Sequence, residues 1–291
     1  MRQMRKPSFP TPDRQGFTLL ELLAVITIIA ILVALISPSI FRALGTARQA
    51  EVTAEMNRLS TGINRFKTDH NGVMPWSAVI IPEDPGTNAW GSISKSRIRR
   101  VWPQFNFSTV NDLNGDGDTD DELTLTASEC LVFFLGGVRV SGTENTLAGF
   151  SKNPVNPFNQ TGSNRTTPFE FDVARLVDTD SDGMLEYVDP IEGQQTPMLY
   201  VSSNNGQGYS NTDGSLNYYV QEDGTTPWHK DGFQLISPGE DGEYGFDPAP
   251  NPFDSTGGTT DSRPVFSSET EVSLPERDNI ASFNPGATLG R

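Results

Sequence analysis

The sequence predicts an α+β protein in which a long N-terminal helix, first membrane-spanning and then amphipathic, packs on an antiparallel-sheet head with long loops. Three observations predict this class. Residues 17–36 form an uninterrupted apolar run, and residues 52–66 carry apolar side chains at helical spacing. Residues 76–291 contain short strand-like segments between loops rich in Gly, Asp, Asn and Pro.

The composition excludes several classes of function. The chain has 37 Asp and Glu against 21 Lys and Arg, a formal charge of −16. Because this charge repels phosphate backbones, we expect no nucleic-acid partner. Cys130 is the single cysteine, and His70 and His229 are the two histidines. This excludes an intrachain disulfide and the cysteine pairs or quartets of a structural zinc or iron–sulfur site.

The first 36 residues have the layout of a targeting segment. Residues 1–16 are a basic leader with a net charge of +3, and residues 17–36 contain Glu21 as their single charge. A helix over the 20 residues of this run spans about 30 Å, the thickness of a hydrocarbon core. The basic leader orients the N-terminus toward the cytoplasm and places everything after the span outside it.

Three interpretations of this segment are open. A secretory signal peptide, cleaved near Ala43-Leu44-Gly45, would have a shorter apolar region. A plain single-pass anchor would leave Glu21 unexplained, because a lone carboxylate costs about 2.5–3.5 kcal/mol in a spanning helix. In the third interpretation, cleavage after Gly16 leaves a new amine on Phe17, about one helical turn from Glu21. The two charges can then pair within one subunit or between neighbours.

The run Gly-Phe-Thr-Leu-Leu-Glu at residues 16–21, followed by an apolar stretch and Pro38, resembles the class III signal of type IV pilin-like proteins. The resemblance implies that a prepilin peptidase cuts after Gly16 and methylates Phe17. It also implies that Glu21 positions each incoming subunit in a helical fibre. Residues 62–75 are similar to the helix end of the major pseudopilin of type II secretion.

The resemblance implies a structural subunit of a type IV pilus-like fibre or a type II secretion pseudopilus, without catalytic activity. Its partners would be copies of itself, other pilin-like subunits, prepilin peptidase and the inner-membrane assembly platform. It would cross the inner membrane once, with a periplasmic head, before entering the fibre. The alternative is a membrane-anchored extracytoplasmic enzyme or carbohydrate-binding protein that carries the same signal.

Beyond the span, residues 37–70 are expected to form an amphipathic helix, with a kink at Pro38. Its apolar stripe consists of Val52, Met56, Leu59, Ile63 and Phe66. Residues 71–250 form the predicted head, and residues 251–291 a tail with few apolar anchors that is expected to be poorly ordered. Within the head we expect a buried helix over residues 126–135 and strands over residues 169–176, 198–201, 216–221 and 233–237.

An acidic loop at residues 178–189 has the spacing of a calcium-binding loop. Oxygen ligands at alternate positions can fold around one ion, and Gly183 permits the sharp turn that this requires. A solvated acidic turn is the alternative. The ligands predicted here are Asp178, Asp180, Asp182, the Met184 carbonyl, Glu186 and Asp189.

Two further acidic stretches are weaker candidates, so one to three calcium ions are expected. The second loop shares the first half of the pattern but has Leu123 at the last ligand position, and its candidates are Asp112, Asn114, Asp116, Asp118 and Asp121. The third stretch, residues 233–245, resembles the C-terminal loop of major pseudopilins. That resemblance implies calcium ligation by Asp241 and Glu243. An exposed turn is the alternative in both places.

Overall fold

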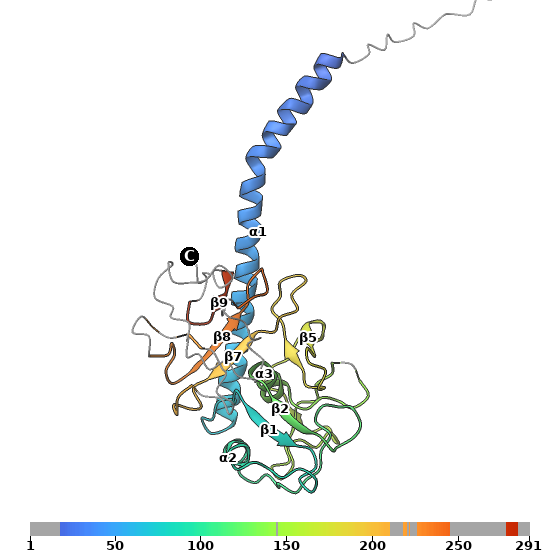
Figure 1. The fold of residues 1–291 in the computed structure, drawn as a ribbon, viewed down its shortest axis with the longest axis vertical. Helices are drawn as coiled ribbons and strands as arrows, with labels where there is room; N and C mark the ends of the chain where they lie inside the picture. The colour runs from blue at the N-terminus through green and yellow to red at the C-terminus, as the bar shows by residue number, and fades with distance from the viewer. Residues whose placement is uncertain are drawn as a thin grey trace, which may run out of the picture. The chain divides into compact units, whose positions relative to one another are not determined.

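The computed structural model describes residues 18–143, 145–209, 218–219, 221, 226–244 and 278–284. The chain divides into two compact units, Met1–Ala47 and Arg48–Arg291. The elements are labelled in Figure 1 in chain order: α1 (Leu19–Asp69), β1 (Val79–Pro82), α2 (Ser92–Val101), β2 (Glu122–Leu125), α3 (Ala127–Gly136), β3 (Phe150–Ser151), β4 (Arg165–Thr166), the 3-10 helix η1 (Val173–Arg175), β5 (Leu176–Val177), β6 (Glu186–Tyr187), β7 (Leu199–Ser202), β8 (Phe233–Ser237) and β9 (Ile280–Ala281).

The first unit contributes the apolar part of α1. An 18-residue window of this helix has a mean hydropathy of 3.0 and no buried residue, which by length and composition suffices to cross a membrane. The helix is continuous through Pro38. Pro38 therefore does not end the helix, although proline removes one backbone donor, and a kink at Pro38 stays a prediction.

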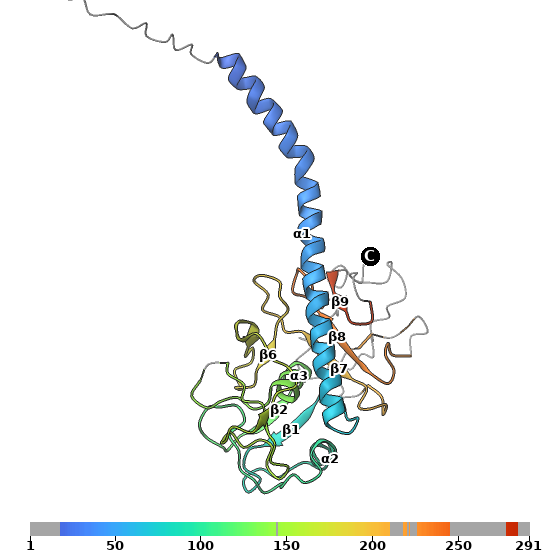
Figure 2. The same ribbon diagram turned by 180° about the vertical axis from the view of Figure 1, so that it is seen from behind.

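The second unit is organised around the C-terminal part of α1 and the short helix α3. The predicted stripe from Val52 to Phe66 is buried, with each of its five side chains at most 3 % exposed. All ten residues of α3 are buried as well. Rings of Phe66 and Phe134 meet edge to face at 5.7 Å, which joins the two helices in one core. The view from behind shows α1 running along the head beside β7 and β8 (Figure 2).

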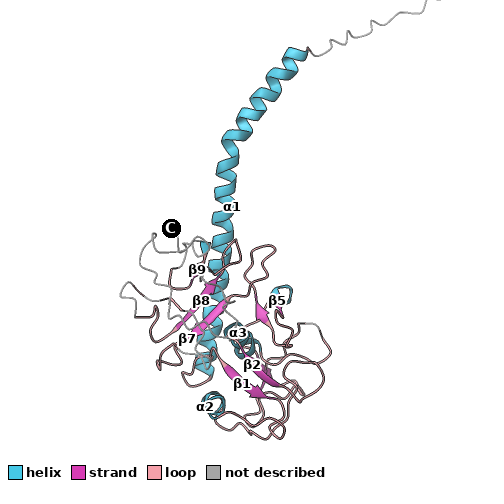
Figure 3. Ribbon diagram, in the orientation of Figure 1, coloured by secondary structure: helices cyan, strands magenta, loops and turns pink. Residues whose placement is uncertain are grey.

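In the described part of the chain, the strands form four small antiparallel sheets rather than one large sheet. β1 pairs with β2, β3 with β4, and β5 with β6, while β7, β8 and β9 form a three-stranded sheet. Loops make up much of the head between them (Figure 3). The α+β class predicted from the sequence is confirmed.

Several sequence-based expectations for single elements need correction. The helix near residues 126–135 and the strands near residues 198–201 and 233–237 are confirmed. The strand predicted over residues 169–176 is wrong, because Asp172 caps the 3-10 helix η1 through its bond from the Ala174 N–H. Of the strand predicted over residues 216–221, residues 216, 217 and 220 lie outside the described residues, and residues 218, 219 and 221 are not in a strand.

The tail predicted to be poorly ordered contributes a strand to the sheet. β9 pairs with β8 in antiparallel register, Ile236 opposite Ala281 and Ser237 opposite Ile280. Ile280 and Ala281 are both buried. Two apolar residues are thus enough to anchor this part of the tail, because β8 offers them an open edge. The rest of residues 251–291 lies almost entirely outside the described residues.

Candidate functional site

The start of α1 holds Glu21 in a capping box with Thr18. Glu21 Oε2 accepts hydrogen bonds from the Thr18 N–H at 2.9 Å and the Thr18 hydroxyl at 2.8 Å. The Thr18 hydroxyl in turn accepts from the Glu21 N–H at 3.2 Å. The pattern Thr-x-x-Glu is a sequence signal for this arrangement. Gly16 and Phe17, the predicted cleavage and methylation positions, lie outside the described residues.

Large apolar side chains are exposed along the first unit of α1. They run from Leu19, which is 83 % exposed, to Leu44, which is 50 % exposed. An apolar surface of this length needs cover, which a lipid bilayer or the helices of other subunits can provide. The arrangement fits a membrane anchor that can also pack into a fibre.

The acidic loop that leads into β2, residues 112–122, lies around a buried carboxylate that the sequence analysis missed. Glu83 follows β1 directly and is 1 % exposed. Its Oε1 accepts from the N–H groups of Leu113 and Asn114. One carboxylate oxygen each of Glu83, Asp118 and Asp121 lie within 4.8 Å of one another. The structure therefore adds Glu83 to the second predicted cluster.

The loop at residues 178–186 is completed by a buried carboxylate in the same way. Glu129, in the first turn of α3, is 0 % exposed, and its oxygen lies within 4.8 Å of oxygens of Asp180 and Asp182. Its Oε2 accepts from the Thr126 N–H at 2.6 Å, which closes the capping box of α3. One side chain thus caps a helix and joins the acidic loop.

Burial makes these carboxylates costly to ionise. It raises the pKa of Glu129 to about 8, and the neighbouring charge of Asp182 adds to this effect. Burial likewise raises the pKa of Glu83 to about 7, that of Glu186 to about 7 and that of Asp182 to about 6. Among the described residues, the ion pairs of the two loops are limited to Arg139 with Asp178 at 3.6 Å.

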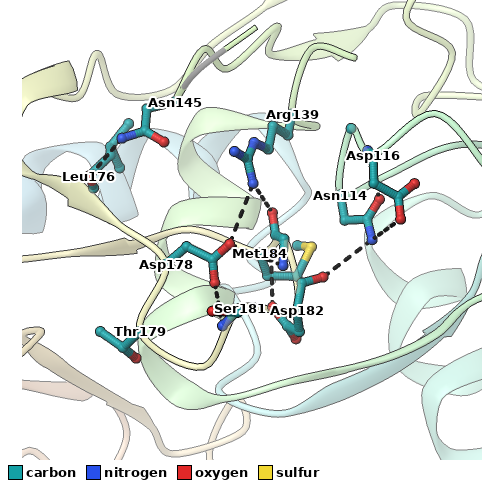
Figure 4. Close-up of polar contacts among 12 residues, drawn as sticks. Asn114, Asp116, Arg139, Asn145, Leu176, Asp178, Thr179, Ser181, Asp182 and Met184 are labelled. Atoms are coloured by element: carbon teal, nitrogen blue, oxygen red, sulfur yellow. Dashed lines mark hydrogen bonds and ion pairs between the residues drawn. The ribbon is translucent and has the colours of Figure 1, made fainter. Parts of the chain in front are cut away.

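The two acidic loops touch each other, although about 60 residues separate them in the chain. The Asn114 side-chain amide donates to Asp121 Oδ2 at 3.0 Å and to the Asp182 carbonyl at 3.2 Å. Arg139 donates to the Gly183 carbonyl at 2.8 Å. Figure 4 shows Asn114 facing the Asp182 turn from one side and Arg139 reaching it from another. The second loop therefore packs directly on the first.

Replacement of Gly183 by alanine tests this contact, with Gly193 as the matched control. Both glycines have positive φ, +87° and +85°, so each alanine carries a backbone cost of about 1 kcal/mol. A Cβ at position 183 would lie 2.8 Å from Asn114 Cβ, whereas one at position 193 would meet nothing within 4 Å. We expect Gly183→Ala to lower the free energy of unfolding by about 1–3 kcal/mol more than Gly193→Ala. Urea unfolding followed by tryptophan fluorescence measures the difference, and equal losses would contradict the close packing of the loops.

The remaining predicted ligands of the first loop divide between two places. Glu186 stays with the loop, because its Oε2 accepts from the N–H and hydroxyl of Thr179. Met184 belongs to the turn, where its N–H donates to Asp182 at 2.8 Å. Asp189, the predicted twelfth-position ligand, instead accepts from the Ser237 hydroxyl and the Ile191 N–H. The Asp189 side chain therefore contacts Ser237, the last residue of β8.

In the second loop, the short side chains fold the backbone back on itself. Asp112 accepts from the Gly115 N–H at 2.6 Å, and Asp116 accepts from the Asp118 N–H at 3.0 Å. Asn114 accepts from the Asp116 N–H at 3.2 Å. These are turn contacts of the usual kind for Asp and Asn. They bring the predicted residues of this loop together around Asn114.

The third candidate pair lies beside a residue of the tail. The Asp241 N–H donates to Asp278 Oδ2 at 3.0 Å, and Asp241 Oδ1 accepts from the Glu243 N–H at 2.9 Å. Burial raises the pKa of both Asp241 and Asp278. Calcium ligation by Asp241 and Glu243 stays a prediction, and Asp278 is the neighbour that sequence reasoning missed.

The comparisons with known proteins concern the N-terminal segment. Residues 12–37 match the family model described as the prokaryotic N-terminal methylation motif. No curated protein and no solved structure matches the chain. The matched segment contains the predicted cleavage position, Glu21 and the apolar part of α1. The motif marks the chain as type IV pilin-like at its N-terminus and implies processing by prepilin peptidase and assembly with pilin-type subunits.

Proposed function

We propose that this protein is a structural subunit of a type IV pilus-like or type II secretion pseudopilus fibre. The observation that carries the proposal is the methylation motif over residues 12–37 at the head of an exposed apolar helix. A signal of this type points to a structural protein. The similarity of residues 62–75 to the major pseudopilin of type II secretion supports the pseudopilus as one form of the fibre.

The charge pattern supports one orientation in the membrane. The basic leader stays in the cytoplasm by the positive-inside rule, so the unit Arg48–Arg291 lies in the periplasm. The membrane anchors the subunit until the assembly platform draws it into the fibre. There, α1 exchanges lipid contacts for contacts with copies of itself and with other pilin-like subunits. The exposed apolar side chains from Leu19 to Leu44 suit both surroundings.

Cleavage after Gly16 supplies the partner that Glu21 needs in an apolar environment. The capping box occupies Glu21 Oε2 with Thr18. The amine created on Phe17 is four residues from Glu21 in the chain and carries the opposite charge. In a low-dielectric surrounding, such charges attract strongly, and either one alone is costly. Pairing between subunits would therefore fix the position of each incoming helix.

The mass of the N-terminal peptide from membrane-extracted protein tests the processing step. We expect a chain that begins with N-methylated Phe17. Gly16→Leu is expected to leave the leader attached, whereas Gly45→Leu, at the alternative cleavage site, should leave the mature mass unchanged. A wild-type chain that begins at Met1 or after Gly45 would reject the proposal.

A further inference from the structure

Two buried carboxylates in the head each have one oxygen without a hydrogen-bond partner among the described residues. They are Glu83 Oε2 and Glu129 Oε1. The other oxygen of each side chain is used by backbone N–H groups, from Leu113 and Asn114 in one case and from Thr126 in the other. A buried oxygen that accepts nothing is costly, and a native structure usually satisfies it. Each of these two oxygens is therefore available to bind a cation.

The neighbours of these two side chains are further carboxylates. Asp118 and Asp121 share one group with Glu83, and Asp180 and Asp182 share the other with Glu129, each group within 4.8 Å. Three carboxylates this close repel one another, and the one ion pair described for these loops, Arg139 with Asp178, includes none of the grouped carboxylates. A cation at the centre of each group would convert the repulsion into attraction and give the buried oxygen a partner.

We propose that the head binds two neighbouring calcium ions, one between Glu83 and the loop at residues 112–121 and the other between Glu129 and the loop at residues 178–186. Each site combines loop acids with one buried carboxylate, which directly follows β1 in one case and lies in the first turn of α3 in the other. The proposal does not depend on the fibre role and would hold for any function of the head.

The chemistry of the ligands selects a hard cation. Both groups consist of carboxylates, without histidine or cysteine, and such oxygen sets suit calcium or magnesium rather than zinc or copper. Calcium accepts six to eight oxygens in irregular geometry, which these loops can supply together with carbonyls and water. Magnesium demands near-ideal octahedral geometry, which one loop and a fixed carboxylate meet less readily.

The contact between the loops makes the two sites neighbours. Asn114 donates to Asp121 in the first group and to the Asp182 carbonyl in the second. The ions would therefore fasten both loops to each other, to the strand β1 and to the buried helix α3. Since α3 lies beside β6 and β7, calcium would stabilise the centre of the head rather than a peripheral turn.

Calcium binding to the full chain in detergent micelles tests the proposal. The protein is stripped with chelator, kept in millimolar Mg²⁺ so that calcium-selective binding alone is counted, and titrated with Ca²⁺ in equilibrium dialysis. We expect saturation at two ions per chain. Glu83→Gln and Glu129→Gln should each lose one ion, with an affinity loss at the altered site of more than about tenfold.

Asp189→Asn is the matched control, because this acid is buried and belongs to the predicted loop but bonds to Ser237 and Ile191. It should retain both ions. If a glutamine variant unfolds by circular dichroism, Asp118→Asn and Asp180→Asn replace it, since these group members are exposed. They should each lose one ion. Failure of the wild type to bind calcium under these conditions, or two ions retained in the variants, would overturn the proposal.

Discussion

Glu21→Gln is expected to exclude the protein from fibres while its head stays folded. Glutamine can replace glutamate in the capping box with Thr18, so the start of α1 is preserved and the variant removes the charge alone. The variant leaves the amine of Phe17 without its partner, and a lone charge costs about 2.5–3.5 kcal/mol in a spanning helix. Incorporation is therefore expected to fall by more than about tenfold.

The amount of subunit in sheared fibres, relative to the amount in membranes, measures this effect. Glu51→Gln is the control, because Glu51 is an exposed acid on the same helix but belongs to the second unit. It should enter fibres as the wild type does. Fibres that contain Glu21→Gln at wild-type levels would refute the assembly role of the carboxylate.

Arg175→Met is expected to cause the largest loss of stability in the head. Arg175 Nη2 lies 2.7 Å from Glu55 Oε1, and the Tyr187 hydroxyl donates to the same oxygen at 2.8 Å. The Glu55 side chain is 6 % exposed and that of Arg175 is 15 % exposed. Removing one partner of a buried ion pair costs about 3–5 kcal/mol, and the variant leaves Glu55 with the exposed Arg58 as its remaining cationic partner among the described residues. Methionine keeps the apolar stem, so the loss reports on the guanidinium, which also donates to the Tyr187 hydroxyl and lies over the Tyr187 ring.

A second arginine on the same carboxylate provides the control. Arg58 Nη1 lies 2.8 Å from Glu55 Oε2, but its side chain is 62 % exposed. An exposed pair contributes about 0–1 kcal/mol, so Arg58→Met should change stability little. Urea unfolding of the full chain in detergent, followed by the fluorescence of the four tryptophans, compares the two variants. Equal losses would show that the buried position of Arg175 does not matter.

The local pattern of the sequence is sufficient to predict the helix of the N-terminal segment and the turns of the acidic loops. The 20-residue apolar run and the apolar stripe at helical spacing are both patterns of residues close together in the chain. The structure confirms the helix and the burial of the stripe in α1. The alternating acids of residues 178–186 likewise fold into one turn, with Ser181 and Gly183 in the left-handed region. Short-range steric and charge effects decide these features, and they are visible in the residue order.

Tertiary structure decided which distant groups join the loops. Glu83 and Glu129 reach them from β1 and α3, while Asp189 turns away to Ser237 on β8. Likewise, β9 from the tail completes the sheet beside β8. These choices follow from burial of the core around α1 and α3, which brings together segments 30 to 50 residues apart in the chain. Residue spacing cannot predict such contacts, because the free energy that selects them comes from packing of the whole head.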